Sequence, residues 1–186
     1  QLTVMGTGAT ALITTNQSRV DINGALELGL MRWWAMDSMS GTSVLDLSVN
    51  GNKTTSGALV NGAALSVGRF GKAVTFDGSN DEVQTNLTVS QMPPSGTATI
   101  WFKPSRVFNS GTREFLMGGS DATSTFSFQH FSDNNLYIGW VFGGVDYRVI
   151  VAASASNWVQ NQWQQYTLTW TNGGRATLYR NGVAIA

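Results

Sequence analysis

The sequence predicts an all-β fold, a two-sheet antiparallel jelly-roll sandwich. Three observations predict it. Short runs rich in Val, Thr, Ile, Tyr, Phe and Trp recur along the 186 residues, and clusters of Gly, Asn and Ser separate them. Several runs alternate apolar and polar residues, which is typical of antiparallel strands with one buried face. Helical periodicity is nearly absent, which argues against helical fold classes.

The alternation defines the individual strands. In Thr97–Lys103 apolar residues occupy every second position, and Gln164–Thr171 repeats this pattern. In chain order, the expected strands are Leu28–Met36, Ala73–Phe76, Asp81–Gln84, Thr97–Lys103, Arg113–Gly118, Thr125–Phe131, Asn135–Phe142, Val145–Ala152, Gln164–Thr171 and Arg175–Arg180.

Glycine-rich turns connect the later strands. Asn172-Gly173-Gly174 supplies residues that tolerate positive φ, so Tyr166–Arg180 is expected to form a hairpin. Gly143-Gly144 is expected to form a second turn. No composition break divides the chain, so residues 28–186 are expected to form one domain. Residues 1–27 fit the pattern less well and are expected to form an arm, a linker or an added strand.

Charge and composition exclude several classes of partner. The net charge is zero and only 12% of the residues are charged, with no basic stretch. Binding to nucleic acid or to an anionic membrane through a charged face is therefore not expected. No apolar run reaches the length of a membrane span. A surface of Ser, Thr, Asn and Gly is common in proteins that are extracellular, on a cell surface or on a virus particle.

Four stretches, taken in order, resemble a LamG-like (laminin G-like) jelly-roll domain of the concanavalin A-like lectin/glucanase superfamily. In the first, Met36 stands where the family usually has Phe. In the second, Val49 replaces the usual Gly. The stretches are Gly29–Asp37, Asp46–Asn52, Gly68–Val83, and Asn161–Trp170 with Leu178–Val183.

The resemblance also implies strands that the sequence lacks. Domains of this kind continue past the Asn-Gly-Val turn with an acidic strand that pairs beside the opening strand, and no stretch here matches it. The C-terminal strands are therefore expected to be missing, with an open edge beside Leu30–Met36. The arm could fill this edge, within one chain or from a neighbouring subunit, and the edge would also allow self-association.

Catalysis is not expected. The glucanase branch of the superfamily uses paired carboxylates on one strand, whereas the glutamates here are Glu27, Glu82 and Glu114, and none has that spacing. Asp81 and Glu82 are neighbours and point to opposite faces of a strand. The single histidine, His130, lies in an aromatic strand and has no serine motif.

Calcium is a candidate cofactor, because relatives often hold it at a rim of loops. Calcium takes six to eight oxygen ligands, and two loops are rich in such groups. The alternative is that these side chains only form turn hydrogen bonds. The candidate ligands are Asp46, Asn50, Asp77, Asn80 and Asp81.

Sugar binding requires an aromatic platform, and the chain has seven tryptophans. Trp140 and Tyr147 flank the Gly143-Gly144 turn and Trp158 lies in a loop, so these three are expected to be exposed, and Trp101 falls on the polar face of its strand. These four residues are the candidate ligand-binding residues. The alternative is that they are core residues, as aromatic residues in a sandwich more often are.

These observations favour a non-catalytic, extracellular recognition or adhesion module that binds carbohydrate or a surface protein. The alternative is a structural subunit of an extracellular or viral assembly, completed by strand exchange. A glycoside hydrolase is a third hypothesis, and it lacks its carboxylate pair.

Overall fold

The computed structural model describes residues 30–48, 56–142 and 144–186. The described residues divide into two compact units: the first comprises residues 30–48, 56–66 and 72–86, and the second comprises residues 67–71, 87–142 and 144–186. Strands dominate both units and pair antiparallel, with one short 3-10 turn, η2 (Val89–Gln91), in the described part. The predicted all-β antiparallel jelly-roll sandwich is confirmed.

The first unit contains a four-stranded sheet in the order β1-β2-β3-β6. Its opening strand differs from the expected Leu28–Met36, because it starts at Trp34 and ends at Ser40. Met36 has a positive φ of 62°, and the register against β2 shifts between Trp34 and Met39, so a bulge interrupts the strand. The strands are β1 Trp34–Ser40, β2 Ser43–Asp46, β3 Gly57–Val60 and β6 Glu82–Gln84.

A two-stranded hairpin, β4 (Ala64–Val67) and β5 (Lys72–Thr75), follows β3. The Lys72 N–H donates to Asp37 Oδ1 at 2.7 Å, which ties β5 to β1. In the described part of its sheet, β1 is an end strand. The expected arm, residues 1–27, lies outside the described residues, so strand exchange through it stays a prediction.

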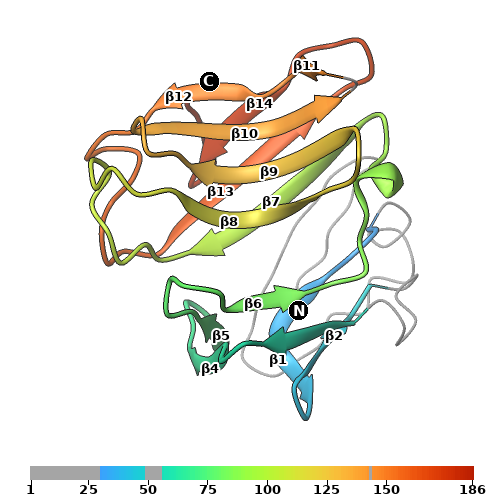
Figure 1. The fold of residues 1–186 in the computed structure, drawn as a ribbon, viewed down its shortest axis with the longest axis vertical. Coiled ribbons are helices and arrows are strands. Elements are labelled where there is room, and N and C mark those ends of the chain that lie inside the picture. The colour runs from blue at the N-terminus through green and yellow to red at the C-terminus, as the bar shows by residue number, and fades with distance from the viewer. Residues whose placement is uncertain (1–29, 49–55, 143) are drawn as a thin grey trace, which may run out of the picture. The chain divides into compact units, whose positions relative to one another are not determined.

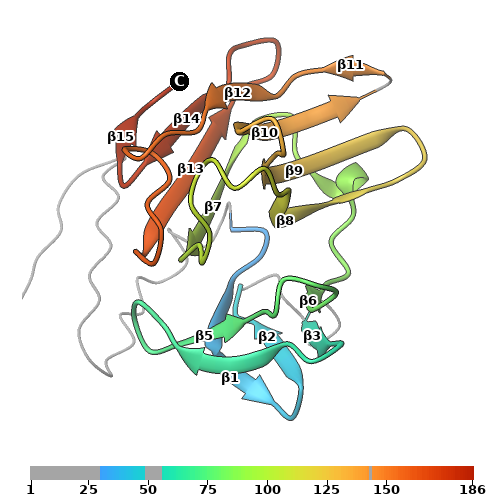
Figure 2. The ribbon, with the colours of Figure 1, turned by 60° about the vertical axis from the view of Figure 1, so that its left-hand side comes forward.

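The second unit is a sandwich of two sheets (Figures 1 and 2). One sheet has the order β15-β14-β13-β7, and the other has the order β11-β10-β9-β8, with β12 also paired to β10. The strands are β7 Gly96–Phe102, β8 Glu114–Ser120, β9 Ser124–His130, β10 Asn135–Phe142, β11 Val145–Asp146, β12 Val149–Ala152, β13 Gln164–Trp170, β14 Thr177–Arg180 and β15 Val183–Ala184.

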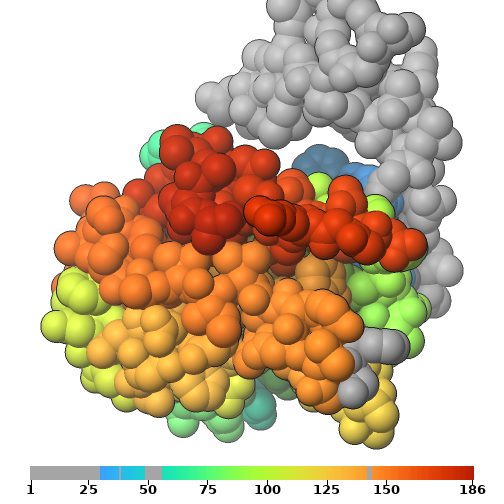
Figure 3. All heavy atoms as spheres, turned by 90° about the horizontal axis from the view of Figure 1, so that it is seen from above, coloured from blue at the N-terminus to red at the C-terminus, as the bar shows by residue number. Residues whose placement is uncertain are grey.

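The hydrophobic core lies between these two sheets. Along β13, Tyr166, Leu168 and Trp170 point inward and are buried, as the alternation predicts. β10 contributes Leu136 and Ile138 from the opposite sheet, both fully buried. Figure 3 shows the orange β10–β12 region and the red C-terminal strands side by side over the top of this unit. Two packed layers around one core are the architecture that the sequence predicted.

The predicted hairpin is confirmed, with Tyr166 paired to Arg180 and Gly173 at a φ of 67° in the turn. The expected strand Val145–Ala152 is instead split into β11 and β12. The connection between them, Tyr147 and Arg148, packs against Gly139, where an added Cβ would lie 3.1 Å from Arg148 Cα. Only glycine leaves room for this close approach.

Candidate functional site

Asp46, a candidate calcium ligand, accepts hydrogen bonds from the backbone around it. Its Oδ1 accepts hydrogen bonds from the N–H groups of Trp33, at 3.0 Å, and Ser48, at 2.9 Å. Its Oδ2 lies 3.7 Å from Arg32 Nε, and the side chain is fully buried. Asp46 is the last residue of β2, and its side chain joins the segment before β1 to the segment after β2. This matches the alternative that it forms turn hydrogen bonds.

Asp77, Asn80 and Asp81 belong to one turn before β6. The Ser79 N–H donates to Asp77 Oδ1 at 2.7 Å, and the Asp77 N–H donates to Asp81 Oδ2 at 2.9 Å. Asn50 lies outside the described residues. In the described ranges, no three His, Asp or Glu side chains come together in a way that could hold a metal ion. Calcium binding stays a prediction from the sequence.

Two of the expected aromatic ligand residues face the core. Trp158 is only 1% exposed, so the expectation that its loop presents it to solvent is wrong. The Trp158 N–H bonds the Ser154 carbonyl at 2.9 Å in a tight turn, and the indole stacks on His130 at 4.8 Å. Trp140 is half-buried and packs on Trp170 at 4.6 Å. Trp140 follows the inward alternation of β10, which outweighs its position beside a turn.

The other two expected residues are exposed, as predicted. Trp101 is 38% exposed, on the same face of β7 as Thr99, whose hydroxyl lies 2.9 Å from that of Thr167. The Phe70 ring covers part of it edge to face at 5.8 Å. Tyr147 is 58% exposed, on the connection between β11 and β12 that packs against Gly139. Trp101 and Tyr147 lie on different sheets, so the four expected residues do not form one site.

The sheet that carries Tyr147 presents a site that the sequence reasoning missed. Its outer face is turned toward the viewer in Figure 1. Strand register places Phe115 opposite Gln129, Gln129 opposite Tyr137, and Tyr137 opposite Ile150. These four side chains form one row across β8, β9, β10 and β12. With its neighbours Arg113, Phe131 and Arg148, the row defines the arginine–aromatic face: Arg113, Phe115, Gln129, Phe131, Tyr137, Arg148 and Ile150.

A buried amide fixes the centre of this face. Gln129 is only 3% exposed although it points outward from the sheet. Its Oε1 accepts from Arg113 Nε at 3.0 Å and Nη2 at 2.7 Å, and its Nε2 donates to Ser127 Oγ at 3.1 Å. Both ends of the amide are satisfied, so its orientation and that of the guanidinium are set before any ligand arrives.

Rings and guanidinium groups alternate across the face. The Arg113 Cζ lies 5.6 Å from the Phe115 ring and 5.0 Å from the Phe131 ring. Phe131 packs edge to face on Tyr137 at 5.3 Å, and the Arg148 Cζ lies 4.7 Å from the Tyr137 ring. Each cation is within cation–π distance of a ring. The result is a continuous, partly exposed array rather than scattered aromatic residues.

Two carboxylates at the rim of the face accept hydrogen bonds from neighbouring side chains. Tyr137 donates its hydroxyl to Asp133 Oδ2 at 2.6 Å, and this bond lowers the pKa of Asp133 and raises that of Tyr137. Arg148 donates to both oxygens of Asp146, at 2.9 and 2.5 Å, which holds the pKa of Asp146 below its usual value. Both acids are therefore ionised at neutral pH, and both act as anchors for residues of the face.

Glycine at position 118 lets Phe115 lie flat on the sheet. An added Cβ there would come within 2.9 Å of Phe115 Cζ and 2.2 Å of the Phe126 carbonyl oxygen.

The signal available in the sequence was the pair Ser127 and Gln129 in the midst of an aromatic strand. Polar residues on the outward side of a central strand are expected to bond to neighbours when they are buried.

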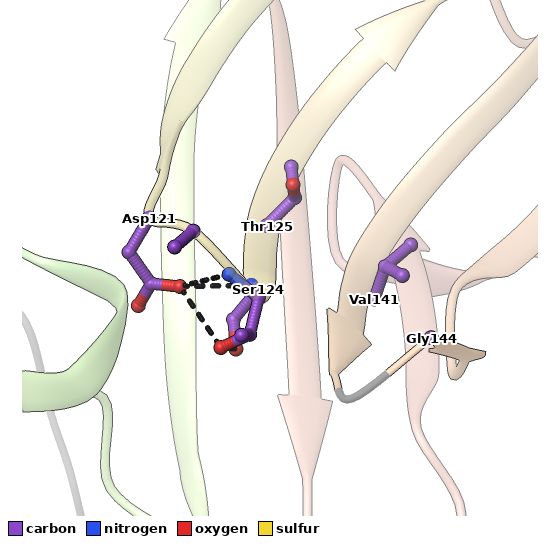
Figure 4. Close-up of a pocket in the computed structure, with 7 residues that line it drawn as sticks. Asp121, Ser124, Thr125, Val141 and Gly144 are labelled. Carbon is purple, nitrogen blue, oxygen red and sulfur yellow. Dashed lines mark hydrogen bonds between the residues drawn. The ribbon is translucent and has the colours of Figure 1, made fainter.

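A shallow depression at one end of this sheet offers less to a ligand. Its lining combines the Asp121–Thr125 turn with Val141 and Gly144 (Figure 4). One oxygen of Asp121 accepts bonds from the N–H groups of Thr123 and Ser124, so the acid serves the turn. No aromatic ring lines the depression among the described residues.

His130 and Glu114 form a separate buried pair inside the sandwich. His130 is fully buried beneath Trp158, and its Nδ1 lies 3.9 Å from Glu114 Oε2. Burial raises the pKa of Glu114, and Arg106 partly opposes that effect. The histidine has no opening to solvent, so this pair belongs to the core and not to a surface site.

Comparison with known proteins supports a family. The Laminin_G_3 family model, described as "Concanavalin A-like lectin/glucanases superfamily", matches residues 77–186. That range covers more than half of the chain and includes every strand of the arginine–aromatic face. No curated protein and no solved structure matches the chain. In the described residues, no helix is long and apolar enough to span a membrane.

Proposed function

The chain belongs to the concanavalin A-like lectin/glucanases superfamily, and from this membership and the arginine–aromatic face we propose that it is a non-catalytic module that recognises carbohydrate. At the family level, membership supports a binding module for carbohydrate or protein. The row Phe115–Gln129–Tyr137–Ile150 across four strands is the observation that carries the choice of carbohydrate.

The chemistry of the face suits a sugar. Saccharide rings have apolar C–H faces that lie against aromatic rings, and hydroxyls that need oriented donors and acceptors. Phe115 is 50% exposed and offers the ring, while Arg113 offers oriented donors beside it. Ile150, 52% exposed at the other end of the row, extends the apolar surface. A rigid strand scaffold limits the entropy lost on binding.

The rim carboxylates support recognition without hydrolysis. Glycoside hydrolysis needs one carboxyl group with a raised pKa, which protonates the leaving oxygen, and a second carboxylate across the bond. Asp133 and Asp146 have lowered pKa values and are bonded to Tyr137 and Arg148. Neither fits the role of the acid. We accordingly propose an extracellular binding role, in keeping with the usual location of LamG-like domains.

Glycan binding by the full chain and by two matched variants tests this proposal. Phe115→Ala removes the exposed ring of the arginine–aromatic face, and Trp101→Ala removes the exposed ring of the opposite sheet. We expect Phe115→Ala to weaken saccharide binding roughly tenfold, as loss of a stacked ring does, and Trp101→Ala to leave it unchanged. Urea unfolding midpoints of both variants report whether they remain folded.

Two results would overturn the proposal. One is a loss of binding in Trp101→Ala but not in Phe115→Ala, which would move the site to the other sheet. The other is the absence of any saccharide binding by the unaltered chain. Each measurement is repeated with calcium and with a chelator, so the same experiment tests the calcium prediction.

A further inference from the structure

Arg113 has hydrogen-bonding capacity that the described residues do not use. A guanidinium carries five N–H donors in a planar fork. Arg113 directs Nε and one Nη2 hydrogen to the single oxygen of Gln129. The opposite edge, formed by Nη1 and the second Nη2 hydrogen, has no acceptor in the described part of the chain. Like the Nε–Nη2 edge that Gln129 occupies, this edge can bind two oxygens of an oxyanion side by side.

The charge of Arg113 is also uncompensated. The ion pairs of arginine in the described residues involve Arg32, Arg106 and Arg148. Arg148, the other cation of the arginine–aromatic face, is neutralised by Asp146 at 2.5 Å. Arg113 is exposed, and it instead donates to the neutral amide of Gln129. Among the described residues, the face therefore carries one positive charge that has no ion-pair partner, and it lies beside the aromatic row.

The surroundings hold this charge in place for a ligand. The rings of Phe115 and Phe131 lie on either side of the guanidinium, at 5.6 and 5.0 Å from Cζ. Gln129 is itself held by Ser127. A long, flexible arginine side chain ordinarily loses much conformational entropy when it binds, and this one is already ordered. An exposed cation that is held by a buried amide and two rings is suited to recognition of an anion.

We propose that Arg113 binds an oxyanion carried by the saccharide, the carboxylate of an acidic sugar or a sulfate ester, so that the ligand is an anionic glycan. This inference rests on the proposed carbohydrate-binding function. The anion pairs with the Nη1–Nη2 edge while the sugar ring lies against Phe115. Carboxylate and sulfate share the two adjacent oxygens that this edge recognises, and the experiment separates them.

The test uses matched pairs of glycans: a uronic-acid or sialylated glycan with its carboxyl-reduced form, and a sulfated glycan with its desulfated form. Dissociation constants are measured for the unaltered chain, Arg113→Gln, Arg113→Lys and Arg175→Gln. Arg175 is an exposed arginine in the β13–β14 turn, so its replacement removes the same charge elsewhere. Unfolding midpoints confirm that each variant is folded.

We expect the unaltered chain to prefer one anionic glycan over its neutral partner by about 10- to 100-fold, the range of a charge-assisted bidentate bond. Arg113→Gln should abolish this preference, because the anionic glycan loses its charge-assisted bond whereas its neutral partner loses only the hydrogen bonds of Arg113 to its hydroxyls. Arg113→Lys should keep part of the preference, because it retains the charge without the fork. Arg175→Gln should behave like the unaltered chain.

Several outcomes would overturn the inference. Equal losses for neutral and anionic glycans in Arg113→Gln would mean that Arg113 only supports the aromatic rings. The same loss of preference in Arg175→Gln would indicate a general charge effect. Stronger Arg113-dependent binding of a glutamate-rich peptide than of any glycan would assign the face to a protein partner. If neutral glycans bind through Phe115 and anionic glycans bind no more tightly, the inference about Arg113 is wrong and the proposed carbohydrate-binding function is retained. If no glycan binds, both are wrong.

Discussion

At the scale of single residues, Glu114 links stability to pH. Its pKa is raised by burial, with Arg106 at 3.7 Å opposing the shift and His130 facing its other oxygen. A raised pKa means that the folded state binds the proton more tightly than the unfolded state. The contribution of Glu114 to stability is therefore full below the ordinary pKa of 4.5 and declines as pH rises through the folded value.

Glu114→Gln should remove this decline, because the amide stays neutral. We expect the variant to gain stability relative to the unaltered chain as pH rises from about 4 to 7. Urea unfolding at several pH values measures the difference. A difference that stays constant with pH, or that shifts against the variant as pH rises, would show that Glu114 is not the group responsible.

Two neighbouring glycines of β8 should differ strongly in how much stability the same substitution costs. At Gly118, with a φ of 153°, an added Cβ would lie 2.2 Å from the Phe126 carbonyl oxygen, whereas at Gly119 no atom lies within 4 Å. Gly118→Ala should therefore destabilise the protein by about 2 kcal/mol or more. Gly119→Ala should change stability by less than about 0.5 kcal/mol. Chemical denaturation of both variants checks the contrast, and equal effects would contradict the packing of this strand.

At the scale of elements, the turn between β8 and β9 sets the register of the sheet that carries the arginine–aromatic face. Asp121 Oδ1 accepts from the N–H of Thr123 at 2.9 Å and of Ser124 at 2.8 Å (Figure 4). The bond from Thr123 holds the pKa of Asp121 below its usual value of 3.8. Side-chain bonds of this kind stabilise a tight turn, here together with the backbone bond from the Asp121 N–H to the Ser124 carbonyl at 2.9 Å.

Replacement of Asp121 should weaken this turn in a pH-dependent way. A lowered pKa gives stability that is present above the unfolded value and is lost as pH falls through the folded value. Asp121→Ala should thus lower the unfolding midpoint at neutral pH, and the deficit should shrink in acid. Asp121→Asn keeps an acceptor oxygen and should retain part of the midpoint. A deficit in Asp121→Ala that persists unchanged in acid would argue against a charged acceptor.

Most strands of the second unit followed from the sequence, whereas β2, β3 and β4 were not predicted and neither was the site. The alternation in Gln164–Thr171 gave the inward face of β13 because each side chain of a strand alternates sides. Trp158 was misplaced because loop residues are usually exposed, and nothing local shows that a tight turn directs this indole onto His130. Gln129 became visible as a site residue only when register placed Phe115 and Tyr137 beside it. Such pairings join segments distant in sequence, which a single sequence does not specify.

At the scale of the whole molecule, the two units differ in how much apolar surface they bury. Among the described residues, Val44 is the one fully buried hydrophobic side chain of the first unit. The remaining buried hydrophobic residues belong to the second unit, where rings and aliphatic side chains of both sheets form one cluster. Because burial of apolar surface is the main favourable term in folding, the second unit should hold most of the stability.

Hydrogen exchange of backbone amides should reveal this difference directly. We expect amides of β2 and β3 to exchange with a lower opening free energy than amides of β9 and β13, which lie at the centre of the two packed sheets. Low concentrations of urea should lower the protection of the second unit, which opens only on global unfolding, more steeply than that of the first, because more surface is exposed. If all strands share one opening free energy and one urea dependence, the chain unfolds as a single cooperative unit, and binding at the arginine–aromatic face would then be coupled to the stability of β1–β3. If the two differ, the recognition face can stay intact while the first unit opens.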